Sequence, residues 1–181
     1  MRNLALLLPL LCVAGLASAA PASEAALADV MRTLHKDTMG ASSAEMMVAE
    51  VPSLKVLPEG DRQCARSALH AVLIGQARQS VINDLGDDGD TVIAEWARFL
   101  DTPSGKGYLA LEGAVSAAEA EAIDVQSEQY QSVFAAFLAS PAHTRLTASF
   151  SRLAMPGDLP EQLAKGLQDQ CRIALNPKEI S

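Results

Sequence analysis

The sequence predicts an all-α fold, a single-domain bundle of about seven or eight helices. Apolar residues recur at the three- and four-residue spacing of a helix face through most of the chain, and no alternating run rich in β-branched residues indicates a strand. At two points a hydroxyl residue and a proline follow the end of such a face, which predicts helix–Pro corner–helix units. The 181 residues suffice for one domain with a sizeable core.

The first nineteen residues have the pattern of a secretory signal peptide. Arg2 supplies a positive start, Leu4–Leu16 is apolar, and Ala17-Ser18-Ala19 is a small-residue cleavage site. As a helix, this apolar run is too short for the roughly 30 Å hydrocarbon core of a bilayer. We therefore expect a mature domain of residues 20–181 without an integral membrane span, located in the periplasm or secreted. An uncleaved anchor is the alternative.

The cysteines indicate a disulfide. Cleavage leaves Cys64 and Cys171 in an exported chain, which predicts one bond between them. Neither has a cysteine or histidine at the spacing of a metal site, and two separate buried thiols are the alternative. Cys12 leaves with the signal. Lipidation of Cys12 is the other possibility, although Leu10 and Leu11 stand where a lipidated cysteine has small residues.

Capping residues and breakers place the N-terminal helices. Ser23 precedes an apolar helix face, and Gly40 with Ala41 ends that segment. Ser42-Ser43-Ala44-Glu45 has the pattern of a capping box, which predicts the start of a second helix. Pro52 and Pro58 bracket an irregular stretch. The face of the first helix comprises Leu27, Val30, Met31 and Leu34.

A long helix is expected from about Asp61 to Leu85, with Cys64 near its start. The two glycines and three aspartates of residues 86–90 end it, because they continue a helix poorly. Two further capping boxes, Ser116–Glu119 and Asp158–Glu161, predict later helices, and Cys171 falls near the end of the last one.

The two proline corners share one pattern. Phe99-Leu100-Asp101-Thr102-Pro103 is followed by Phe137-Leu138-Ala139-Ser140-Pro141. In each, we expect a helix to end on Phe-Leu and a hydroxyl to cap a new helix with proline in its first turn. All seven aromatic residues lie between Trp96 and Phe150, at spacings that favour packing in the core over a ligand site.

The acidic segment after the long helix is a candidate calcium loop. Asp84, Asp88 and Glu95 occupy the first, fifth and twelfth positions of such a loop, with Gly89 at the sixth. Gly86 at the third position brings no oxygen ligand, and Thr91 replaces the usual aliphatic residue. The favoured interpretation is an acidic turn at the start of the next helix, where negative charge is stabilising.

The first proline corner is a candidate anion site. Ser104, Gly105 and Lys106 begin a helix, where free backbone N–H groups and the helix dipole favour an anion and a lysine adds positive charge. An ordinary capped corner with a solvated lysine is the favoured interpretation.

Composition and motifs exclude several function classes. A formal net charge of −8 argues against nucleic-acid binding, and 4% aromatic residues argue against a sugar-stacking surface. No Gly-x-Ser-x-Gly, His-Glu-x-x-His or Walker pattern is present, and no cofactor is expected. His35, His70 and His143 are far apart in sequence, so a hydrolase would need a site assembled in space.

The segment Trp96–Leu109 resembles the DUF2059 group, a bacterial exported domain of unknown function. Phe99, Thr102, Pro103, Gly105 and Lys106 fill much of the pattern Phe-x-x-[Ser/Thr]-Pro-x-Gly-x-Lys, with Lys106 one place early. The resemblance implies a small helical periplasmic domain and no particular activity.

Together these features predict an exported, non-enzymatic interaction or accessory module with a protein or envelope partner. Two alternatives remain. The apolar, Ala- and Met-rich composition fits a binder of a small apolar ligand or lipid, and the histidines allow a hydrolase.

Overall fold

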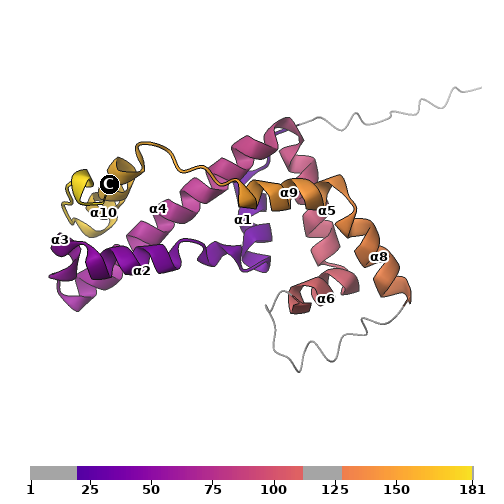
Figure 1. Cartoon of the computed structure of the whole chain (residues 1–181), viewed down its shortest axis with the longest axis horizontal. Coiled ribbons are helices and arrows are strands. Elements are labelled where there is room, and N and C mark those ends of the chain that lie inside the picture. Colours follow the sequence, from indigo (N-terminus) through magenta and orange to yellow (C-terminus); the bar gives the residue numbers. More distant parts are fainter. Residues whose placement is uncertain (1–19, 112–127, 181) are drawn as a thin grey trace, which may run out of the picture.

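The computed structural model describes residues 20–111 and 128–180, and within these ranges all regular secondary structure is helical (Figure 1). The predicted all-α bundle is confirmed. Eight helices in these ranges have nine residues or more. The elements are α1 (Glu24–Thr33), η1 (Lys36–Thr38), α2 (Ala41–Glu50), α3 (Pro52–Lys55), α4 (Glu59–Leu85), η2 (Gly86–Asp88), α5 (Gly89–Leu100), α6 (Pro103–Leu111), α8 (Glu128–Leu138), α9 (Pro141–Ser151), α10 (Leu159–Cys171) and η3 (Pro177–Glu179).

Helix α4 is the axis of the molecule. At 27 residues it is about 40 Å long, and different helices cover its two halves (Figure 1). Helices α2, α3 and α10 pack around the N-terminal half, whereas α1, α5 and α9 pack near the C-terminal half. The predicted long helix and its end are confirmed, and Gly86 leaves the helix with a φ of +60°.

Two hydrophobic clusters lie on opposite halves of α4. The first, the aliphatic core, joins α2, α3, α4 and α10 and comprises Ala44, Val48, Val51, Leu54, Ala65, Ala68, Leu69, Leu73, Leu163, Leu167 and Leu175. The second, the aromatic core, joins α1, α4, α5, α8 and α9, with Trp96, Phe99 and Phe137 buried inside it. Because both clusters use α4, the chain forms one continuous bundle.

The predicted disulfide is confirmed. Cys64 lies in the second turn of α4 and Cys171 is the last residue of α10, and their sulfur atoms are bonded, with Cα atoms 5.9 Å apart. The bond joins the two helices beside the aliphatic core.

Both predicted proline corners are confirmed and use the same hydrogen bonds. The Thr102 hydroxyl accepts the N–H of Gly105 at 3.0 Å, and the Ser140 hydroxyl accepts the N–H of His143 at 3.2 Å. The two corners meet through their phenylalanines. Phe99 and Phe137 stack face to face with ring centroids 3.6 Å apart.

The helix starts predicted from the capping boxes are less accurate. Helix α2 begins at Ala41 after Gly40, which has a φ of +85° and makes no side-chain cap, so the predicted start at Ser42 was wrong by two residues and the box at Ser42–Glu45 lies inside the helix. Helix α10 does follow Asp158, but that carboxylate accepts from the Gln162 amide instead of capping the backbone. The box at Ser116–Glu119 lies outside the described residues.

Loss of the disulfide should lower stability strongly. We expect the double variant Cys64→Ser/Cys171→Ser to reduce the free energy of unfolding by about 4 kcal/mol, because the bond closes a loop of 107 residues that the unfolded chain otherwise leaves free. Urea unfolding followed by circular dichroism measures this. A decrease below about 1 kcal/mol would contradict the prediction.

The first corner has no room for a side chain at Gly105. A Cβ atom there would lie 2.1 Å from the Phe99 carbonyl oxygen, at the end of α5. We expect Gly105→Ala to destabilise the chain by about 2 kcal/mol or more, through forced backbone movement. Gly75→Ala in α4 is the matched control. A Cβ there meets nothing within 4 Å, so this change should stabilise by up to about 1 kcal/mol. Urea unfolding followed by circular dichroism measures both variants.

Candidate functional site

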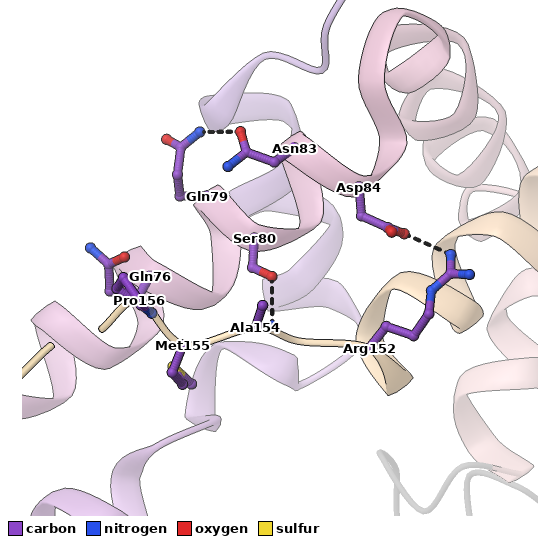
Figure 2. A pocket seen from close by; sticks show the side chains of 9 residues that line it. All are labelled: Gln76, Gln79, Ser80, Asn83, Asp84, Arg152, Ala154, Met155 and Pro156. Atoms are coloured by element: carbon purple, nitrogen blue, oxygen red, sulfur yellow. Dashed lines mark hydrogen bonds and ion pairs between the residues drawn. The ribbon is translucent and has the colours of Figure 1, made fainter. Parts of the chain in front are cut away.

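A groove lies between α4 and the segment that connects α9 to α10 (Figure 2). Its volume is about 460 Å³. Helix α4 lines one side with Gln76, Gln79, Ser80 and Asn83, which share a face because three to four residues make one helical turn. Met155 and Pro156 of the connection line the other side.

The connection is fixed beside α4 by two contacts. The backbone N–H of Ala154 donates to the Ser80 hydroxyl at 2.9 Å, and the neighbouring Leu153 packs against the aromatic core. The next side chain, Met155, is 50% exposed. The connection therefore has a defined position and leaves a flexible thioether side chain at the groove.

At one end of the groove, two charged side chains form an ion pair with each other. The buried Ser149 hydroxyl donates to the Asp84 carboxylate at 2.5 Å, and the Arg152 guanidinium donates to it at 2.8 Å. The Ser149 hydrogen bond and then the Arg152 hydrogen bond hold the pKa of Asp84 below its ordinary value, against a smaller opposing effect of burial. Asp84 is therefore ionised at neutral pH, and Arg152 balances its charge.

Arg145 makes a second set of contacts to the end of α4. It donates to Asp88 at 2.6 Å and to the Leu85 carbonyl at 2.5 Å. Since the last carbonyls of a helix have no partner within it, a cation there is stabilising. Together with Ser149 and Arg152, Arg145 joins α9 to the C-terminal end of α4.

These contacts favour the acidic-turn interpretation of the calcium candidate. Asp84 lies in the last turn of α4, Asp88 in η2 and Glu95 within α5. The first two carboxylates bind different arginines. Within residues 20–111 and 128–180, no group of three His, Cys, Asp or Glu side chains is arranged to hold a metal ion.

The residues of the anion candidate lie partly in the interior and partly on the surface. Ser104 is 4% exposed, and its hydroxyl donates to the Tyr130 carbonyl at 3.4 Å. The N–H of Gly105 already donates to Thr102, while Lys106 lies on the surface. An anion at this corner would have to displace internal acceptors.

Each of the three histidines lies in a different local environment of the fold. His35 lies between α1 and η1 with a φ of +53°, and a ring nitrogen of His70 lies 2.9 Å from the Asp37 carbonyl. His143 stacks on Trp96, with ring centroids 5.7 Å apart. In the described ranges, no hydrogen bond joins a histidine side chain to a serine hydroxyl or a carboxylate.

The groove offers hydrogen bonding by neutral groups. Its lining contains three carboxamides, one hydroxyl and one ion pair, and it contains no histidine and no cysteine. Sequence reasoning did not select Gln76, Gln79, Asn83 or Met155. The recurrence of amides at positions 76, 79 and 83 was the available signal, but such a row is also common on solvated helix faces.

No protein-family model, curated protein or solved structure matches this chain. Membership of the DUF2059 group therefore remains a prediction. Among the described helices, none is apolar over a length sufficient to cross a membrane.

The Asp84 contacts predict a measurable pKa effect. In an NMR titration, the Asp84 carboxyl should titrate below the ordinary value of 3.8, and Ser149→Ala or Arg152→Ala should raise its pKa toward that value. Because the folded-state pKa is lowered, the stabilisation is present above the unfolded-state pKa and is lost as pH falls through the folded-state pKa.

Arg32→Ala is the control for the Asp84 titration, since Arg32 pairs with Asp29 on α1. An Asp84 pKa that stays the same in Ser149→Ala and Arg152→Ala, or that shifts equally in Arg32→Ala, would show that these hydrogen bonds do not set it.

Proposed function

We propose that the chain is a non-enzymatic binding module that acts in the periplasm or outside the cell, and that it recognises a partner through the groove beside α4. The observation that carries this proposal is the composition of the groove. It presents hydrogen-bonding amides on a rigid helix, and its only charged groups neutralise each other. Such a surface binds a ligand and supplies no group suited to bond cleavage.

The proposed location rests on the disulfide and the signal-like sequence. A structural disulfide between distant residues is typical of proteins in oxidising compartments. The expected signal peptide, residues 1–19, lies outside the described residues. The cleavage site and the final location are therefore part of the proposal.

The apolar-ligand alternative receives less support from the groove. The side chains that an apolar ligand would need are buried in the aromatic and aliphatic cores. The groove itself offers three carboxamides, and its apolar residues are Ala154, Met155 and Pro156 of the connection. We therefore place protein or polar envelope components ahead of lipids.

The groove can be tested by site-specific crosslinking in the cells that produce the protein. A photoreactive amino acid at position 155 should give a discrete crosslinked product, whereas the same amino acid at Met46 should not. Met46 is 61% exposed but lies on α2. The product at position 155 should disappear when Asn83→Arg fills the groove.

Cell fractionation completes this test, because the mature oxidised chain should appear outside the cytoplasm. Equal products at positions 155 and 46, or a product at 155 that survives Asn83→Arg, would contradict the groove as the binding surface. Recovery of the chain only in the reduced cytoplasmic fraction would contradict the proposed location.

A further inference from the structure

The Gln79–Asn83 pair leaves one amide carbonyl and one NH₂ group outside its mutual hydrogen bond. The Gln79 amide donates to the Asn83 carbonyl at 2.9 Å, so the Gln79 carbonyl and the Asn83 NH₂ group keep their hydrogen-bonding capacity. Exchanging the roles of the two amides again leaves one carbonyl oxygen and one NH₂ group. Both residues are exposed and line the groove (Figure 2).

An acceptor beside a donor is complementary to the N–H and C=O of one residue in an extended chain, which point to the same side of that chain. A polypeptide main chain offers an N–H donor and a C=O acceptor at each residue, and neutral amides can pair with both. Gln76 extends the row. Its NH₂ group donates to Gln162 at 2.5 Å, and its carbonyl oxygen faces no hydrogen-bond donor in the described part of the chain.

The length of the amide row suits an extended chain. Residues 76 to 83 span about 10 Å along a helix at 1.5 Å per residue, which about three residues of an extended peptide also cover at 3.3 Å each. On the opposite side, Met155 offers a flexible apolar contact for a ligand side chain.

The charge of the groove favours a neutral ligand group. Asp84 and Arg152 form an ion pair, and Ser149 also donates to Asp84, so the two opposite charges offset each other at this end of the groove. The lining contains no aromatic ring on which a sugar would stack. The main chain of a polypeptide satisfies both conditions.

We propose that the groove binds an extended segment of a partner polypeptide through its main-chain amides, with Gln79 and Asn83 contacting the N–H and C=O of one residue. This inference rests on the proposed binding function and specifies the chemical class of the ligand.

Peptide binding to the oxidised full chain tests the proposal. A displayed library of random decapeptides is selected on the chain, and the strongest peptide is labelled and titrated by fluorescence polarisation. The double variant Gln79→Leu/Asn83→Leu should bind about tenfold more weakly, the effect expected for two lost hydrogen bonds. Gln168→Leu removes an exposed carboxamide from α10 and should leave affinity unchanged.

Backbone methylation separates main-chain recognition from side-chain recognition. N-methylation at one position of the peptide should weaken binding to the wild-type chain about fivefold and have little further effect on the double variant. A failure to select any peptide, or equal affinities for the wild type and the double variant, would overturn the proposal.

Binding of an N-acetylglucosamine tetramer that the double variant loses, without peptide binding, would overturn the proposal in favour of a glycan. In that case crosslinking at position 155 can still succeed. The proposed binding function would then be supported, and the proposed class of ligand would be wrong.

Discussion

The fold depends on covering one long helix along its whole length. Helix α4 carries buried side chains from Ala65 to Leu85, and an isolated helix with such a face is unstable in water. The chain covers it with helices from both sides of the sequence: α1 and α2 precede it, and α9 and α10 follow it. These contacts are distant in sequence, so the disulfide between α4 and α10 removes much of the entropy that keeps the unfolded chain from making them.

The groove is a consequence of this arrangement. Helices α9 and α10 pack on opposite halves of α4, so the segment between them must run alongside α4 (Figure 1). Leu153 faces the aromatic core, and Ser80 fixes the backbone of Ala154. The segment that follows lies beside polar residues of α4, since the apolar face of that helix is already covered. The groove thus forms where two packed halves of a bundle are joined.

Local features were predictable from the sequence, and distant pairings mostly were not. The corners at Thr102 and Ser140 were found because a hydroxyl, a proline and the preceding apolar helix lie within a few residues. The disulfide followed from the two cysteines that remain after the expected signal peptide. The capping box at Ser42 failed because Gly40 turns the chain two residues earlier. The acidic turn was the favoured interpretation of the segment after α4, but the partners of Asp84 and Asp88 are arginines about sixty residues later, which no local pattern indicated. The groove joins residues 76–84 with 152–156, and no local pattern connects these segments.

The repeated corner links the aromatic core to the groove. Because Phe99 and Phe137 stack, the ends of α5 and α8 are held together, and the N-terminus of α9 is placed beside α5. The Trp96 indole then donates to the Ala142 carbonyl at 3.0 Å, and its ring stacks on His143. These contacts fix both the position and the rotation of the first turn of α9. Since a helix is rigid over eleven residues, the same rotation directs Arg145, Ser149 and the following Arg152 toward the end of α4. The corner motif that occurs twice in the core therefore determines which side chains contact Asp84. Through these contacts it also determines the charge of the groove.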